Sequence, residues 1–152
     1  MSGTSDTADK VDAYVRYFET LTPDTIDDLE KVATPDVRFR DPFNDVSGLP
    51  AMRAVLAHMF EQVADPRFEI THRARDGDVA FIRWRFTGRL KALSNRQWEV
   101  IGMSELHLAP DGRIAAHIDH WDAAAQFYAG LPLIGPIIRL LQRRAGRIPQ
   151  SH

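Results

Sequence analysis

The spacing of apolar residues changes once along the chain, from a helical period of about 3.6 to a strand period of about 2, and this change predicts the fold. Near the N-terminus, a Thr-Pro pair at positions 22 and 23 supplies a cap and a first-turn proline for a short helix that runs to Val32. The helix before it is predicted by apolar residues at helical spacing, namely Val11, Tyr14, Phe18 and Leu21. Two helices therefore open the domain.

A third helix follows Gly48 and Pro50 and ends at Asp65-Pro66. Its broad apolar face consists of Met52, Val55, Leu56, Met59, Phe60 and Val63. Four alternating segments come next and indicate strands, over residues 68–75, 79–90, 97–108 and 113–121. Three N-terminal helices followed by a curved, mostly antiparallel sheet indicate an α+β domain in which the helices close one side of a cone-shaped sheet.

Alternate residues of the predicted strand over 79–90 point to opposite faces of the sheet. Arg83 and Arg85 alternate with apolar residues, as in a sheet with one buried face, so we expect both arginines to point away from any cavity. The turn APDGR, residues 109–113, carries an Asp-Gly pair between apolar runs, which favours a hairpin between the last two strands.

Composition and charge exclude several classes of function for this chain. A chain of 152 residues with 44% hydrophobic and 26% charged residues fits one globular domain. A formal net charge of -2 gives no basic excess for nucleic acid, and the absence of cysteine excludes disulfides, thiol catalysis and Cys-based zinc sites. The N-terminus MSGTSDTADK has no apolar segment of the signal-peptide type, so we expect a cytoplasmic protein.

The segment FRDPFNDVSG, residues 39–48, carries the first candidate for chemistry. Asp41 stands directly before Pro42 and Phe43 within an apolar stretch. An Asp-Pro pair often ends a strand and opens a turn, so Asp41 is either a turn cap or a base at the mouth of an apolar pocket. In such a pocket the pKa of a carboxylate rises toward the working pH, where it can take and return a proton. The pattern alone leaves both interpretations open.

The last predicted strand carries the second candidate. By parity His117, Asp119 and Trp121 share one face. They form either the wet face of a two-sided strand or a site in which Asp119 orients His117 or His117 tunes Asp119. A metal needs a third ligand, and the sequence offers no strong one, so we expect no metal.

From Val11 to Trp121 the chain resembles the nuclear transport factor 2-like superfamily, and within it the ketosteroid isomerases and SnoaL-like polyketide cyclases. The resemblance implies a cystatin-like α+β barrel over residues 9–128, preceded by a disordered N-terminus (1–8) and followed by a C-terminal helical extension (129–152). Asp41-Pro42-Phe43 matches the isomerase turn that carries the general base, Tyr17 the oxyanion-hole tyrosine of the first helix, and Trp121 a tryptophan that lines the pocket.

Two features favour the cyclases over the isomerases. Ser104 stands where the isomerases carry a protonated Asp, and a serine hydroxyl is a weaker donor, which argues against steroid isomerisation. The segment 112–114, Gly-Arg-Ile, is followed by His117 and Asp119, and the cyclases carry their acid/base Asp in such a His-x-Asp pair. Asp119 therefore competes with Asp41 for the role of base.

The resemblance implies a small cofactor-independent enzyme that performs isomerase, cyclase or dehydratase chemistry on a hydrophobic carbonyl compound. Asp41 would take the proton, Tyr17 would donate to the enolate oxygen, and Asp119 with His117 would assist or replace Asp41. The pocket would be lined by Ser104, Trp121, Trp84, Phe86, Met52, Leu56 and Met59. The main alternative is a non-catalytic domain that binds a small ligand or dimerises. An epoxide hydrolase is a third hypothesis, and it needs an arginine between two carboxylates.

The resemblance also predicts a homodimer formed through the outer face of the sheet, where Ile101 and Met103 share one parity. The C-terminal tail combines an apolar segment, interrupted by two prolines, with Arg139, Arg143, Arg144 and Arg147. It is too short and too interrupted to span a bilayer. Of a membrane-surface anchor and a short helix that closes the cone or packs on a partner subunit, we favour the helix, because no second membrane signal accompanies the tail.

Overall fold

The computed structural model describes residues 3–146. These residues form two compact units, one up to His120 and one from Trp121 on, and each unit is described by itself. The boundary falls inside the segment 9–128 that the resemblance assigns to one domain.

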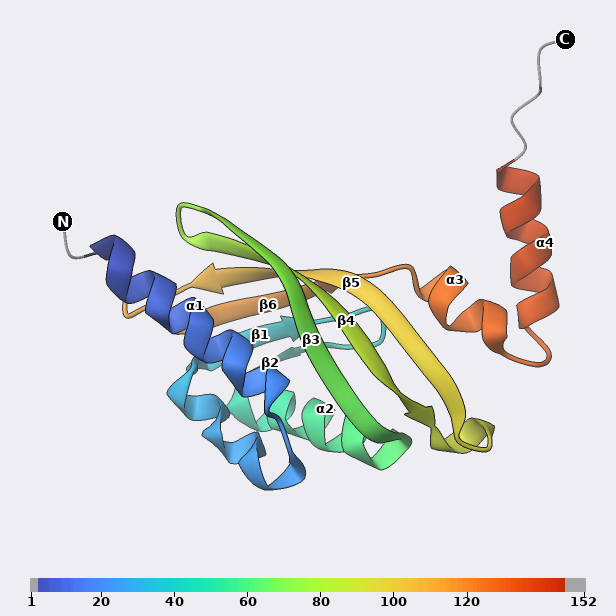
Figure 1. The fold of residues 1–152 in the computed structure, drawn as a ribbon, viewed down its shortest axis with the longest axis horizontal. Helices are drawn as coiled ribbons and strands as arrows, with labels where there is room; N and C mark the ends of the chain where they lie inside the picture. The colour runs from blue at the N-terminus through green and yellow to red at the C-terminus, as the bar shows by residue number, and fades with distance from the viewer. Residues whose placement is uncertain (1–2, 147–152) are drawn as a thin grey trace, which may run out of the picture. The chain divides into compact units, whose positions relative to one another are not determined.

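The first unit is built on a six-stranded sheet with the order β2-β1-β6-β5-β4-β3 (Figure 1). Neighbouring strands are antiparallel, apart from β1 and β6, which are parallel. The elements are α1 (Gly3–Glu19), η1 (Pro23–Lys31), β1 (Ala33–Arg40), β2 (Asp45–Ser47), α2 (Leu49–Gln62), β3 (Val63–Asp76), β4 (Val79–Leu90), η2 (Lys91–Leu93), β5 (Arg96–Leu108) and β6 (Ile114–His120).

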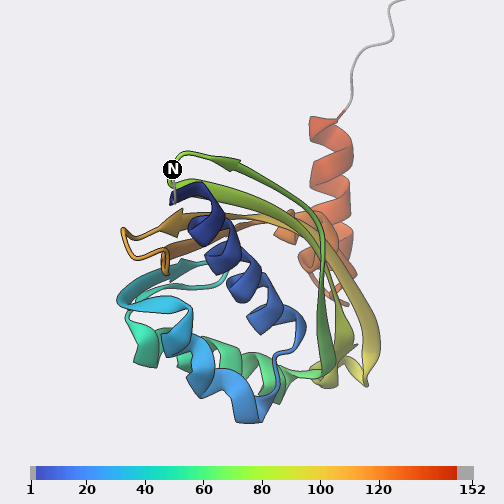
Figure 2. The ribbon, with the colours of Figure 1, turned by 60° about the vertical axis from the view of Figure 1, so that its left-hand side comes forward.

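The sheet is strongly curved, and helices close its concave side. Figure 2 shows α1 running along the hollow of the sheet, with η1 and α2 at its foot. The core between these layers includes fully buried Tyr14 of α1, Leu29 of η1, Met52 of α2 and Leu106 of β5. The predicted mostly antiparallel α+β fold with a cone-shaped sheet is thus confirmed, although β2 and β3 remain edges and the sheet does not close into a barrel.

The N-terminal part differs from the sequence prediction in its details. Strands β1 and β2 precede α2 and were missed by the periodicity: β2 is only 3 residues long, and a register shift between Ala33 and Arg38 interrupts the pairing of β1. The second helix is a 3-10 helix, and α1 begins at Gly3, while the disorder predicted for residues 1–8 stays a prediction. The third helix ends at Gln62. The Asp65-Pro66 pair lies within β3, where the pairing with β4 shifts and Asp65 has φ 51°.

Parity along the central strands is confirmed. Arg83 and Arg85 are exposed on β4, whereas the alternating residues Ala80, Ile82, Trp84 and Phe86 are buried. The predicted hairpin between β5 and β6 is also present, with the Ala109 N–H donating to the Arg113 carbonyl at 2.8 Å. Gly112 of this turn has φ 84°, a backbone conformation that favours glycine.

The second unit contains α3 (Ala123–Gln126), η3 (Tyr128–Gly130) and α4 (Gly135–Ala145). Asp122 caps α3, because its carboxylate accepts the Ala125 N–H at 2.9 Å. Arg139, Arg143 and Arg144 are exposed on α4, and Arg147 lies outside the described residues. Over residues 3–146, no helix is long and apolar enough to cross a membrane.

Candidate functional site

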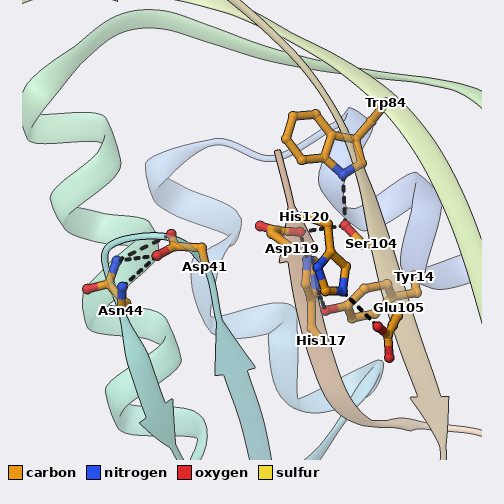
Figure 3. A network of polar contacts seen from close by, with 9 residues as sticks. All are labelled: Tyr14, Asp41, Asn44, Trp84, Ser104, Glu105, His117, Asp119 and His120. Atoms are coloured by element: carbon orange, nitrogen blue, oxygen red, sulfur yellow. Dashed lines mark hydrogen bonds and ion pairs between the residues drawn. The ribbon is translucent and has the colours of Figure 1, made fainter. Parts of the chain in front are cut away.

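A chain of hydrogen bonds runs across three neighbouring strands. The Trp84 indole Nε1–H on β4 donates to Ser104 Oγ on β5 at 2.7 Å, and the Ser104 hydroxyl donates to Asp119 Oδ1 on β6 at 2.5 Å. The sheet register sets Ser104 directly opposite Asp119. Figure 3 shows Trp84 and Asp119 joined through Ser104 by two dashed lines. Adjacent strands thus bring together residues that lie up to 35 positions apart in the sequence.

His117 binds the same carboxylate from its own strand. Its Nε2 lies 2.7 Å from Asp119 Oδ1, and its Nδ1 lies 2.6 Å from the Tyr14 hydroxyl of α1. Because side chains two positions apart on a strand share one face, β6 presents His117 and Asp119 together. His117 is only 4% exposed, so the pair is not the wet face of a two-sided strand.

The network is buried apart from one carboxylate. Tyr14 and Ser104 are 0% and 1% exposed, whereas 16% of the Asp119 side chain is exposed. Burial, and then the charge of Asp119, raise the pKa of Tyr14 well above its ordinary value, so this hydroxyl remains protonated. Asp119 is therefore the group of the network that an incoming molecule can reach.

Asp41 lies in the turn that follows β1. Its Oδ1 accepts the backbone N–H groups of Phe43 at 2.8 Å and of Asn44 at 2.6 Å, and the Asn44 side-chain amide at 3.1 Å. Figure 3 shows its carboxylate turned toward Asn44. These bonds are those of an Asx turn, so Asp41 does cap its turn, as the first of the two interpretations expects.

The environment of Asp41 is nevertheless not that of a solvated cap. Its pKa is raised, first by burial and to a smaller extent by the charge of Asp119, while the hydrogen bonds from Phe43 and Asn44 act in the opposite direction. Two carboxylates that influence each other's charge lie in the same region of the fold. The parallel pairing of β1 with β6 produces this proximity, because it sets Phe39 opposite His117 and Arg40 opposite Ile118.

A pH dependence of stability follows from the raised pKa. An unfolded Asp has a pKa of about 3.9, so above about pH 4 the unfolded chain releases this proton before the folded protein does. The contribution of Asp41 to the free energy of unfolding is therefore largest below the pKa of the unfolded chain. It falls as the pH rises through the raised pKa of the folded protein, and it is constant at higher pH. We expect the free energy of unfolding of wild type minus that of Asp41→Asn to decrease over this window, in urea titrations between about pH 4 and 7. A difference that does not change with pH would contradict this account of Asp41.

Tyr17 lies apart from this network. Its hydroxyl donates to the Ile26 carbonyl of η1 at 2.9 Å, and burial raises its pKa. The tyrosine of α1 that belongs to the network is Tyr14, which the sequence analysis did not identify as a site residue. Both tyrosines belong to the segment YVRYF and are only three positions apart on one helix, so periodicity cannot decide between them. Only their hydrogen-bond partners distinguish the two.

The predicted pocket residues are found in different environments. Trp84, Phe86, Met52 and Leu56 are buried and Met59 is half-buried. Trp121 opens the second unit, and its role at the pocket stays a prediction. Within residues 3–146, no hydrogen bond to Asp41 or Asp119 comes from an arginine, and no group of His, Asp or Glu residues could hold a metal ion.

The Trp84–Ser104 bond can be tested by stability. Ser104→Ala removes the acceptor of a buried indole N–H, and a buried donor without a partner costs about 1–3 kcal/mol. We expect urea unfolding to show a loss of that size. Ser47→Ala, on an exposed position of β2, is the matched control and changes stability by less than about 0.5 kcal/mol. Equal effects of the two substitutions would show that the hydrogen bond is not important for stability.

Comparisons with known proteins agree with this architecture. Among solved structures, the chain is similar to a protein from Jannaschia sp. CCS1 assigned as a SnoaL-like polyketide cyclase, with 20% identity, a TM-score of 0.69, and coverage of 82% of this chain and 93% of that chain. It is also similar to a protein of ketosteroid isomerase-like fold from Catenulispora acidiphila DSM 44928, in complex with trimethylamine, with 20% identity, a TM-score of 0.66, and coverage of 81% and 93%.

A further similar structure is an LEH-like epoxide hydrolase from M. tuberculosis, with 16% identity, a TM-score of 0.64, and coverage of 95% of this chain and 98% of that chain. At these identities the likeness concerns the fold. No curated protein sequence matches the chain. The family model described as a SnoaL-like domain matches residues 14–117. Because this match spans well over half of the 152 residues, the chain belongs to the SnoaL-like domain family.

Proposed function

We propose that this protein is a small cofactor-independent enzyme that performs acid/base chemistry on a hydrophobic carbonyl compound, of isomerase, cyclase or dehydratase type. The observation that carries the proposal is the buried network that ends on Asp119. Both hydrogen bonds that residues 3–146 make to this carboxylate end on Oδ1, so neither of them occupies Oδ2. A carboxylate held in this way, whose charge acts on a second carboxylate, Asp41, suits proton transfer better than simple ligand binding.

The two carboxylates suit different roles. Asp119 Oδ2 would take a proton from the carbon next to the carbonyl, and the electron pair of that C–H bond would form a C=C bond. The carbonyl oxygen would receive the displaced electron pair and a proton from Asp41, which gives an enol. Asp41 suits the acid because its raised pKa makes it hold a proton more readily than an ordinary Asp. Transfer of the proton from Asp119 to another carbon, with return of the enol proton to Asp41, would complete an isomerisation. Attack of the enol on a second carbonyl would close a ring if the new alkoxide took the proton from Asp119 and the enol proton returned to Asp41.

Turnover of a panel of hydrophobic carbonyl compounds, followed by mass spectrometry, tests the proposal. We expect at least one compound to be converted by the wild-type protein and not by the double variant Asp41→Asn/Asp119→Asn. Equal conversion by both proteins would contradict the assigned roles. Binding of the panel compounds without any conversion would instead support the alternative of a non-catalytic ligand-binding domain.

The epoxide hydrolase hypothesis receives less support from the site. It needs an arginine between two carboxylates, whereas Arg83 and Arg85 are exposed on the other face of β4, and Arg85 pairs with Glu99 at 2.6 Å. The similarity to an epoxide hydrolase structure therefore concerns the scaffold, on which different chemistries can be built.

We also propose a homodimer that forms through the outer face of the sheet. Ile101 and Met103 of β5 are 39% and 48% exposed, which suits an apolar contact with a partner. We expect sedimentation velocity to give the mass of a dimer and Met103→Asp to shift the protein toward monomer. A monomeric wild-type protein at high concentration would contradict this proposal. The cytoplasmic location predicted from the N-terminus stays a prediction.

A further inference from the structure

We propose that Tyr14 is a positioning residue that holds His117 as the neutral imidazole with its proton on Nε2, so that Asp119 begins the reaction as a proton acceptor. The tautomer follows from the hydrogen bonds and the burial of Tyr14, and its consequence for the reaction rests on the proposed function. Tyr14 touches His117 and not the reacting carboxylate, so it acts through the histidine.

The direction of the network is set at its Trp84 end. An indole N–H can only donate, so Ser104 Oγ must accept the bond from Trp84. The Ser104 hydrogen is then available for Asp119, whose Oδ1 lies 2.5 Å away. Asp119 therefore accepts at this end of the network.

The direction is set again at the Tyr14 end. The Tyr14 side chain is fully buried, its hydroxyl stays protonated, and its one hydrogen-bond partner within residues 3–146 is His117 Nδ1 at 2.6 Å. A buried hydroxyl hydrogen that finds no acceptor is costly, so it must point at the nitrogen. Nδ1 therefore offers a lone pair, and the imidazole proton lies on Nε2, where it is donated to Asp119 Oδ1.

A hydrogen on His117 Nδ1 does not fit its contact with Tyr14. Such a hydrogen would face the Tyr14 oxygen, and the tyrosine hydrogen would lose its acceptor. The ring also lies among the aromatic rings of Tyr14, Phe18 and Phe39, at centroid distances of 5.7, 5.3 and 5.1 Å, which keep water away from it. The contact with Tyr14 thus favours the proton on Nε2, where it points at Asp119.

This arrangement determines which way the first proton moves. Donors from Ser104 and His117 both point at Oδ1, so the network places Asp119 as an acceptor and neither bond occupies Oδ2. A site that starts in this state suits substrates that give up a proton, and among carbonyl compounds these are the enolisable ones. It is less suited to substrates whose reaction begins with protonation of a leaving group.

Nitrogen-15 NMR of the full-length protein tests the tautomer without any substrate. Long-range correlation spectra of the imidazole rings distinguish protonated from unprotonated nitrogens, and the His117 signals are assigned by their loss in His117→Asn. We expect an unprotonated Nδ1 and a protonated Nε2 in wild type. In Tyr14→Phe, which removes only the hydroxyl, we expect the Nδ1 signal to shift, because this nitrogen loses the hydrogen bond from Tyr14.

The matched control is Tyr17→Phe, which removes a hydroxyl from the same helix that donates to Ile26 instead. It should leave the His117 signals unchanged. A protonated Nδ1 in wild type would overturn the inference. The wild-type spectrum therefore tests the tautomer even if Tyr14→Phe does not fold. An Nδ1 signal that does not shift in folded Tyr14→Phe would overturn it as well. The NMR experiment measures no turnover, so it tests the tautomer separately from the proposed enzymatic function. Either of the two can be confirmed while the other is contradicted.

Discussion

Replacing Asp119 by Asn is expected to lower kcat/KM for a carbonyl substrate by about 10²–10⁴-fold, the range that a positioned general base contributes. The loss arises because the amide nitrogen that takes the place of Oδ2 cannot accept a proton. The amide oxygen can still accept the hydrogen bonds from Ser104 and His117, so we expect the fold and the network to persist. The reduction should appear in kcat rather than in KM, because the missing interaction is made in the transition state.

Three further variants make this result specific. Asp41→Asn should lower kcat/KM less than Asp119→Asn, because the enolate oxygen loses its proton donor while the base remains. Asp36→Asn, on an exposed position of β1, is the matched control and should leave kcat/KM unchanged. Full activity of Asp119→Asn together with loss of activity in Asp41→Asn would reverse the roles proposed for the two carboxylates. His117→Asn removes one of the two donors to Asp119 Oδ1 and should fall between Asp119→Asn and wild type.

Leu106→Ala is expected to lower the free energy of unfolding by about 2–5 kcal/mol, as is usual when a buried leucine is truncated and leaves a cavity. Leu106 is 0% exposed and lies on β5, on the same face as Ser104. Its neighbours across the sheet are Ala80 on β4 and His117 on β6, so a cavity here would also loosen the strand that carries the site. Urea unfolding measures the loss.

The same substitution at an exposed leucine is the control for Leu106→Ala. Leu133 is 88% exposed, so Leu133→Ala should change the free energy of unfolding by less than about 0.5 kcal/mol. Equal effects of the two substitutions would contradict the orientation of β5, and with it the face on which Ser104 lies.

Periodicity predicted the sheet well because its central strands have one buried and one exposed face. On β4, buried Trp84 and Phe86 alternate with exposed Arg83 and Arg85, as expected for a strand with one buried face. Strand β1 gave a weaker signal, since Pro35 and Asp36 interrupt its alternation and its partner in the sheet is β6, far along the chain. Long-range parallel pairing leaves no local pattern in the sequence.

The candidate site was predictable in part. Parity placed His117 and Asp119 on one face, and the structure shows them in contact. The role of Ser104 as a link between Trp84 and Asp119 depends on strand register, which the sequence does not contain. Tyr14 and Tyr17 differ only in what each hydroxyl reaches, Tyr14 the strand β6 and Tyr17 the helix η1. Such a difference is decided by the packing of α1 in three dimensions and not by its own pattern.

The most direct test of the central claim is exchange of the proton next to a carbonyl group. Incubation of enolisable hydrophobic ketones in deuterated water, followed by NMR, measures removal of this proton even where the complete reaction is unknown. We predict that the wild-type protein accelerates deuterium uptake at that carbon and that Asp119→Asn loses this acceleration. Acceleration by Asp119→Asn equal to that of wild type would contradict the assignment of Asp119 as the base.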